Sequence, residues 1–204
     1  MDHMSVQIAK NKPYIVGLTG GIASGKSTAA AYIKSLNIKV IDSDEIVKNL
    51  WKENNEMILK AESLFGFPIK TDADKEKIKK AMCEDKRLRL KLNEITHPFV
   101  FKEINRQLLT FENEKVVVID MPLLFEVSYE KKCDITCLVY VSKNIQLMRL
   151  MSRDDMLEKE AKKLINCQLS LEHKKMKADV IFDNESDLDY LYFQIDQFLR
   201  GLKL

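Results

Sequence analysis

Four of the six glycines in this 204-residue chain fall within nine residues, at positions 17, 20, 21 and 25. Glycine adopts left-handed and other unusual backbone conformations at little steric cost, so the chain concentrates its backbone freedom in one short loop. The loop follows an apolar run, residues 14–18, and precedes an alanine-rich segment, residues 27–36. The sequence therefore predicts a buried strand, a tight loop and a helix, in that order.

The loop has the spacing of a phosphate-binding P-loop. Residues 20–27 read Gly-Gly-Ile-Ala-Ser-Gly-Lys-Ser and fit the pattern G-x-x-x-x-G-K-[ST]. In such a loop backbone N–H groups and the positive end of the next helix surround the phosphates, the lysine reaches the β and γ phosphates, and the hydroxyl binds Mg²⁺. We predict Ser27 as a Mg²⁺ ligand. The residues predicted to contact ATP are Gly21, Ala23, Ser24, Gly25, Lys26, Ser27 and Thr28.

Four further runs rich in Val and Ile continue the pattern. They are residues 38–41, 116–119, 135–141 and 180–182. Apolar runs of this kind, separated by helical stretches, are typical of parallel strands that are covered on both faces. The predicted fold class is α/β, a P-loop NTPase three-layer α/β/α core with a parallel sheet.

Two charged segments with helical patterns interrupt this alternation. Residues 46–113 contain no good strand and are too long for a simple crossover, so we interpret them as a helical acceptor-binding subdomain. Residues 151–174 are interpreted as a helical lid. The expected organisation is a single P-loop kinase domain whose core is formed by residues 13–45, 114–150 and 175–204.

Composition argues against several functions. No run approaches the roughly 18 apolar residues of a membrane span, and residues 1–12 are polar and given no function, so we expect a cytoplasmic chain without a membrane partner. A formal net charge of +2 gives no sign of nucleic-acid binding. The basic runs 75–80 and 173–177 are interpreted as solvated helix faces. Four cysteines without a CxxC pair predict neither a zinc site nor a disulfide framework. We expect a monomer or a weak homo-oligomer.

A P-loop indicates a bound nucleotide without fixing the reaction. Small-molecule kinases, GTPase switches and ATP-driven machines all use it. A GTPase carries N-K-x-D and D-x-x-G motifs, whereas residues 11–14 read Asn-Lys-Pro-Tyr and Asp120 is followed by Met-Pro-Leu. The chain is also short for a motor. These observations favour a kinase of a small molecule.

Six segments together resemble the dephospho-CoA kinase family. They are residues 17–28 (GLTGGIASGKST), 40–44 (VIDSD), 92–98 (LNEITHP), 122–126 (PLLFE), 146–154 (QLMRLMSRD) and 178–184 (ADVIFDN). The resemblance covers residues 14–185 in the order expected of that family. It implies transfer of the γ-phosphoryl group of ATP, with Mg²⁺, to the ribose 3′-hydroxyl of dephospho-CoA, the last step of coenzyme A synthesis.

The resemblance points to Asp44 as the catalytic carboxylate that faces the acceptor hydroxyl. An aspartate just past the carboxyl end of a strand beside the P-loop is placed for this role. The alternative is that Ser43 or Asp44 caps the following helix. Asp42 is expected either to orient a Mg²⁺-bound water or to anchor the loop. Asp120 is expected either to be an outer-sphere Mg²⁺ partner or to be a turn residue.

Arg149 and Arg153 are spaced i and i+4, so they share one helix face and are predicted to point at one target. The resemblance implies lid functions for both: Arg149 on the nucleotide and Arg153 in catalysis. The alternative is surface charge paired with Asp154 or Glu158. Lys26 is the third residue predicted to act in catalysis.

Two further residues are implied by the resemblance. His97 is expected to bind the acceptor, or else to be a satisfied structural histidine. Asn184 is expected in the adenine pocket, although an Asp-Asn turn has the same sequence. The chain departs from the family pattern at three places: Ala23 replaces a glycine, Leu164 stands near the position of a lid arginine, and Glu185 or Ser186 replaces the glycine that commonly follows the segment ending at Asn184.

Overall fold

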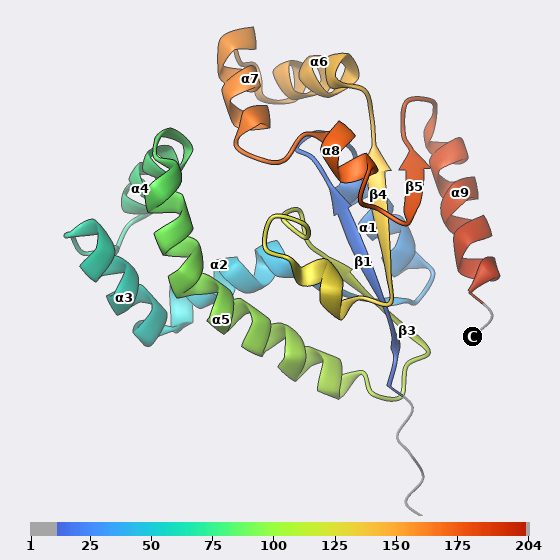
Figure 1. The fold of residues 1–204 in the computed structure, drawn as a ribbon, viewed down its shortest axis with the longest axis horizontal. Helices are drawn as coiled ribbons and strands as arrows, with labels where there is room; N and C mark the ends of the chain where they lie inside the picture. The colour runs from blue at the N-terminus through green and yellow to red at the C-terminus, as the bar shows by residue number, and fades with distance from the viewer. Residues whose placement is uncertain (1–11, 203–204) are drawn as a thin grey trace, which may run out of the picture.

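The computed structural model describes residues 12–202, drawn in colour in Figure 1. The expectation that the first dozen residues have no function therefore falls, except for Lys12, outside the described residues. Residues 12–202 contain nine α-helices, five strands and one 3₁₀ helix. None of the helices in this range combines the length and apolar character needed to cross a membrane.

The five strands form one parallel sheet in the order β2-β3-β1-β4-β5. Their bounds are Tyr14–Gly20 (β1), Lys39–Asp42 (β2), Val116–Asp120 (β3), Ile135–Tyr140 (β4) and Val180–Asp183 (β5). Each strand coincides with one of the apolar runs in the sequence. The prediction of an α/β fold with a parallel sheet is therefore confirmed.

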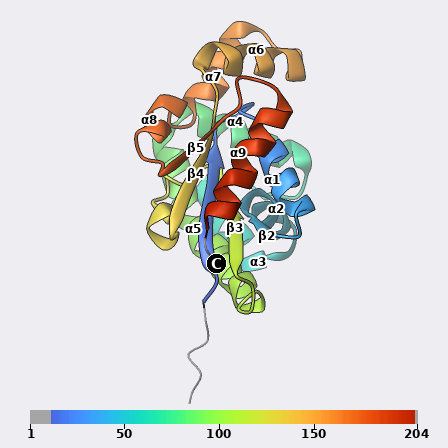
Figure 2. The same cartoon turned by 90° about the vertical axis from the view of Figure 1, so that its right-hand side faces the viewer.

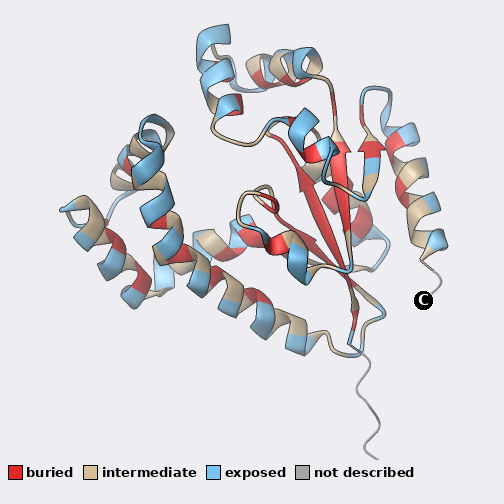
Figure 3. Ribbon diagram, viewed as in Figure 1, coloured by how far each residue is buried: buried red, intermediate tan, exposed pale blue. Residues whose placement is uncertain are grey.

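Helices cover both faces of the sheet, because alternate residues of each strand point to opposite sides. Ile15 faces α5 (Lys86–Thr110), whereas Val16 faces α1 (Lys26–Ser35) and α9 (Leu188–Gly201). In Figure 2, turned by 90°, α1 and α9 lie to one side of the sheet and α8 (Leu171–Lys175) lies to the other. The result is a three-layer α/β/α core, and Figure 3 shows that its central strands are the most deeply buried part of the chain.

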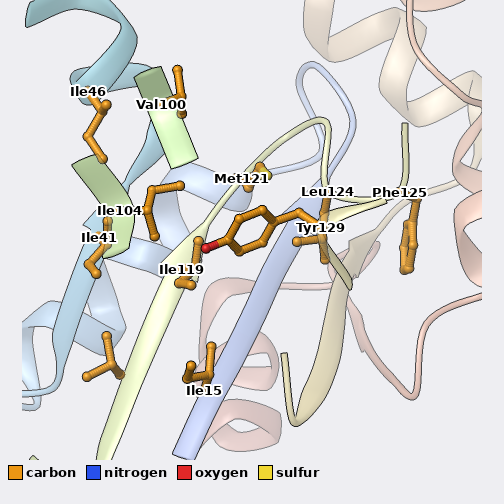
Figure 4. Close-up of a cluster of buried hydrophobic side chains, with 11 residues drawn as sticks. Ile15, Ile41, Ile46, Val100, Ile104, Ile119, Met121, Leu124, Phe125 and Tyr129 are labelled. Atoms are coloured by element: carbon orange, nitrogen blue, oxygen red, sulfur yellow. The ribbon is translucent and has the colours of Figure 1, made fainter. Parts of the chain in front are cut away.

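The core on the α5 side contains the 3₁₀ helix Tyr129–Lys132, labelled η1 in the element order. Tyr129 is 1% exposed and its ring lies among Ile119, Met121 and Leu124 (Figure 4). Phe101 of α5 contacts the same ring, with centroids 5.0 Å apart. This packing fixes the segment after β3 against α5 and so fixes the side of the site that α5 forms.

Four consecutive helices connect β2 to β3. They are α2 (Ser43–Glu53), α3 (Asn55–Phe65), α4 (Asp72–Glu84) and α5 (Lys86–Thr110). They have their own small core around Ala61, Ile78 and Leu92. Because this core is separate from those of the sheet, α3 and α4 extend sideways from the sheet, as Figure 1 shows.

Between β4 and β5 the chain forms α6 (Lys143–Asp154), α7 (Glu158–Asn166) and α8. Leu150 of α6 packs against Ala161 and Ile165 of α7, and Ile22 of the P-loop joins the edge of this cluster. The two helices thus form a unit that rests on the P-loop at the carboxyl end of the sheet.

Candidate active site

The P-loop runs from the end of β1 into α1. Gly25 is the N-cap of α1 and has a φ of 91°, the left-handed region that favours glycine. The side-chain amide of Asn184 donates to the carbonyl of Ser24 at 2.8 Å and lies directly against Gly25. Asn184 follows β5, so the end of that strand holds the P-loop in place.

Gly25→Ala is expected to destabilise the protein by roughly 2–4 kcal/mol, because the new methyl group has an unfavourable φ and overlaps the amide nitrogen of Asn184. Urea unfolding measures this change, and nucleotide titration should show weakened binding. Gly201→Ala is the control, since nothing lies within 4 Å of a Cβ there. Equal stability of the two variants would contradict this account of the loop.

Two glutamines that the sequence analysis missed hold the tip of the P-loop. Gln146 of α6 donates its amide to the carbonyl of Ile22 at 2.8 Å. The amide oxygen of Gln168, after α7, accepts from the backbone N–H of Ile22 at 3.2 Å. Both hydrogen bonds join residues more than a hundred positions apart. Of the two glutamines, only Gln146 lies in a segment that resembles the family.

Ala23 and Leu164, two of the three departures from the family pattern, pack against the same apolar cluster. Ala23 has a φ of 58°, a conformation in which an alanine is strained and a glycine is not. The methyl group of Ala23 therefore adds apolar contact to the cluster of α6 and α7 at the cost of backbone strain. The P-loop and α7 thus each contribute one of these apolar side chains to the edge of one cluster.

Lys26 and Asp120 form the central ion pair of the site. The ammonium group of Lys26 lies 2.6 Å from Oδ1 of Asp120, the last residue of β3. Asp120 is 4% exposed, and burial raises the pKa of its carboxyl group while Lys26 opposes that rise. Asp42 and Asp44 also raise the pKa of Asp120, so the three carboxyl groups are electrostatically coupled around one lysine.

The two aspartates at the end of β2 and the start of α2, Asp42 and Asp44, have different roles. Oδ1 of Asp42 accepts the backbone N–H groups of Asp44 and Glu45, at 2.9 and 3.1 Å, and so caps α2. The alternative that Ser43 or Asp44 caps this helix is wrong, because the cap is one residue earlier. Asp44 lies in the first turn with no hydrogen bond to its carboxylate within the described residues. Its side chain is thus available to a substrate.

Asp44 is accessible to solvent and lines a pocket of the protein. Burial is the main cause that raises the pKa of Asp44, Asp42 adds to the rise, and Lys26 opposes it. A carboxylate with a raised pKa is a better proton acceptor than an ordinary one. The site therefore has the electrostatics that a general base requires.

A pocket of about 210 Å³ opens beside Asp44, between α2, α5 and the segment after β3. Its lining is largely apolar and includes Trp51, Met82 and Phe101, with the polar groups of Asn93 and His97 among them. His97 is half-buried and stacks on Phe101, with centroids 5.5 Å apart, and burial lowers its pKa. A neutral histidine among apolar groups suits contact with a flat, uncharged ring.

Arg149 and Arg153 do not point at one target, so that prediction is wrong. Arg149 donates to the backbone carbonyl of Asn184 at 3.0 Å. Arg153, one turn further along, forms a two-pronged ion pair with Asp154, at 2.7 and 2.8 Å. The reason is that α6 ends at Asp154, which places a carboxylate next to Arg153.

The interpretation of residues 173–177 as a solvated helix face is wrong at Lys174, whose side chain is 0% exposed. Its ammonium group contacts Glu126 at 3.0 Å and donates to the carbonyls of Gly20 and Pro122, at 3.2 and 2.5 Å. Burial lowers the pKa of Lys174, and Glu126 opposes that shift. The lysine ties together the end of β1 and the segment after β3.

Lys174→Met is expected to destabilise the protein by about 3–5 kcal/mol, because Glu126 loses the cation that compensates it. Denaturant unfolding at neutral pH measures the effect. Lys175→Met, one residue further on the same helix, removes a cation 4.0 Å from the Tyr140 ring centroid and should cost about 1 kcal/mol or less. A similar loss in the two variants would mean that Lys174 contributes no more than a surface lysine.

Few protein side chains in the described part of the site could ligate Mg²⁺. Within residues 12–202 no three His, Cys, Asp or Glu side chains gather closely enough to hold an ion by themselves. Mg²⁺ in phosphoryl-transfer sites is usually held by one or two protein groups together with substrate phosphates and water. The hydroxyl of Ser27 and the carboxylate of Asp120 fit that smaller donor set, whereas Oδ1 of Asp42 is already engaged as a cap.

A parallel α/β/α core, a P-loop with its lysine and a helical unit over the loop define a P-loop kinase. The family model for dephospho-CoA kinase matches residues 14–189. The chain belongs to the dephospho-CoA kinase family, as the resemblance of its sequence motifs predicts.

Relatives cover nearly the whole chain. A dephospho-CoA kinase from Fusobacterium nucleatum is 38% identical over 92% of this chain and 98% of its own length. One from Arabidopsis thaliana is 36% identical over 93% of this chain and 84% of its own length. Among solved structures, a dephospho-CoA kinase from Campylobacter jejuni has a TM-score of 0.66 at 27% identity, covering 92% of this chain and 96% of the other.

Proposed function

We propose that this chain transfers the γ-phosphoryl group of ATP to the ribose 3′-hydroxyl of dephospho-CoA and so forms coenzyme A. The observation that supports this most concerns Asp44: it lines a pocket with room for an adenine ring, and it is close enough to the P-loop lysine for Lys26 to oppose the rise of its pKa. The relatives named above carry the same activity in their names.

ATP binds with its phosphates in the P-loop. The backbone of residues 21–25 and the N-terminus of α1 surround the phosphates, with Ser24 and Thr28 beside them. Lys26 exchanges its ion pair with Asp120 for the β and γ phosphates. Ser27 and Asp120 are the residues that would hold Mg²⁺, and the ion would neutralise phosphate charge when bound.

Asp44 orients the acceptor and takes its proton. The 3′-oxygen forms a bond to the γ-phosphorus as the bond between that phosphorus and the β–γ bridging oxygen breaks, and ADP leaves. The hydroxyl proton moves to the carboxylate of Asp44, whose raised pKa favours the transfer. His97, which lines the same pocket, contacts the acceptor.

Residues 46–113 act as the acceptor-binding subdomain and residues 151–174 act as a lid. Closure of the lid excludes water, which would otherwise accept the phosphoryl group. Arg149 and Asn184, joined by a hydrogen bond, form the adenine side of the ATP site. Arg153 leaves Asp154 and stabilises the charge on the transferring group as the lid closes.

The remaining expectations complete the proposal. The enzyme is cytoplasmic, works as a monomer or weak homo-oligomer, and takes small-molecule substrates rather than nucleic acid. The near-neutral net charge of the chain supports the last of these, since nucleic-acid binding usually needs a clear excess of positive charge.

An ADP-release assay tests the proposed substrate. With ATP and Mg²⁺ present, dephospho-CoA should stimulate ADP formation far more than adenosine, AMP or other nucleosides do. Nucleotide titration and thermal unfolding establish that the protein used is folded and binds ATP. Preference for another nucleoside or nucleotide would move the chain to a different acceptor, and turnover with none would make it a nucleotide-binding module.

A further inference from the structure

A large cleft separates the lid from the acceptor-binding helices. It has a volume of about 1270 Å³ and is lined by α4, the start of α5, the end of α6 and α7, with Ile22 of the P-loop at its edge. Figure 1 shows α4 and α7 facing each other across this part of the molecule. From this lining the mechanism above uses only Arg153 and the backbone of Ile22, so most of the cleft has no role yet.

The cleft is strongly basic. Seven of its lining residues are lysine or arginine and four are acidic. Two of the acids are already paired, Asp154 with Arg153 and Glu76 with Lys79. By contrast, Lys80, Arg89 and Lys163 form no ion pair with any group in residues 12–202. They come from α4, α5 and α7, so unpaired cations stand on both walls.

One face of α5 connects this cleft to the pocket beside Asp44. Lys86 and Arg89 line the cleft, and Asn93, Thr96 and His97 line the pocket. The steps of three and four residues place all five on one side of the helix. Arg89 and His97 are separated by about 12 Å along the helix axis, the scale of an extended nucleotide.

We infer that the cleft binds the diphosphate of the acceptor, with Arg89 and Lys80 as its main contacts and Lys163 closing on it from the lid. The inference rests on the proposed function, because dephospho-CoA carries a diphosphate between its adenosine and its pantetheine. With the ribose at Asp44, the 5′-diphosphate extends along α5 toward Arg89. A planar guanidinium and lysine ammonium groups are the side chains that proteins use for such anions.

The site also explains acceptor choice. Adenosine fills the pocket beside Asp44 as well as dephospho-CoA does, but it leaves the cations of the cleft without a partner. The cleft therefore selects acceptors with a diphosphate, whereas the pocket selects the ring. ATP is held at its phosphates by the P-loop, so its binding does not depend on Arg89.

Steady-state kinetics of Arg89→Ala and Lys80→Ala test the inference. Each substitution should raise KM for dephospho-CoA roughly tenfold to a hundredfold, the usual effect of losing a charge-assisted contact. KM for ATP should change by less than about twofold. The matched control is Arg87→Ala: Arg87 is exposed on α5 and lies outside both linings, so wild-type KM values are expected.

Competition with adenosine separates the diphosphate from the rest of the acceptor. The inhibition constant of adenosine against dephospho-CoA should be nearly the same in wild type and Arg89→Ala, because adenosine has no diphosphate. Unchanged KM for dephospho-CoA in both variants, or a rise in KM for ATP instead, would overturn the inference. Absence of turnover in the wild-type enzyme would instead refute the proposed function itself.

Discussion

Lys26→Ala is expected to lower kcat/KM by about two to three orders of magnitude, because the transferring phosphoryl group loses the cation aimed at it. The structure adds a second consequence. Asp120 is buried and has Lys26 as its ion-pair partner, so the variant is also expected to unfold at a lower temperature. Coupled ADP assays and thermal unfolding measure the two effects separately.

A double variant distinguishes catalysis from stability. Lys26→Ala with Asp120→Asn removes the unpaired buried charge, so it should recover most of the lost melting temperature and none of the lost activity. Lys34→Ala, at an exposed position of the same helix, controls for the loss of a lysine from α1. An active Lys26→Ala enzyme would mean that the P-loop lysine does not serve the transfer.

Asp44→Asn is expected to lower kcat by about 10²- to 10⁴-fold, the range associated with loss of a positioned general base. Affinity for ATP should be almost unchanged, since the nucleotide phosphates are held by the P-loop. Isothermal titration with ATP and single-turnover measurements separate binding from transfer. An active Asp44→Asn enzyme would place the base elsewhere.

The raised pKa of Asp44 leads to two further predictions, one for the wild-type enzyme and one for this variant. The base works when ionised, so wild-type kcat/KM should fall as pH decreases through a pKa above the ordinary value of 3.8. Folding favours the protonated form of a group whose pKa is raised, so the ionised Asp44 destabilises the fold at neutral pH. Asp44→Asn should therefore unfold at the wild-type temperature or slightly higher. A clearly lower melting temperature would mean that Asp44 has a structural role.

Much of the fold could be predicted because its signals are local. The strand, loop and helix around Gly25 are encoded within about twenty consecutive residues, and each Val/Ile run became a strand. Open parallel sheets bind ligands at the carboxyl ends of their strands. The approximate positions of Lys26, Asp44 and Asp120 could therefore be predicted from where the strands end.

Other features could not be predicted because two candidates share one pattern. Asp42-Ser43-Asp44 offers several residues for one helix cap, and only the backbone geometry shows that Asp42 takes it. The i, i+4 spacing places two arginines on one face, but it leaves open whether they share a target or pair with a nearby carboxylate, and the structure shows that Arg153 pairs with Asp154. The spacing of residues along a helix predicts which face a side chain leaves from, but it does not predict which partner its charged group contacts.

Lys174 shows the limit for long-range contacts. A basic run on a helix is usually solvated, and nothing in residues 173–177 distinguishes the second residue from the others. Its burial depends on Glu126 and on two carbonyls at the ends of other segments. The acidic end of the segment 122–126 was the available signal, and pairing it with Lys174 required the fold.

The most direct test of the central claim is the chemical identity of the product. After incubation with ATP, Mg²⁺ and dephospho-CoA, mass spectrometry should show a gain of one phosphoryl group. Phosphorus and proton NMR should place that group on the ribose 3′-oxygen, and Asp44→Asn should yield far less of the same product. A phosphoryl group at another position, or none on dephospho-CoA in folded, ATP-binding protein, would contradict the account.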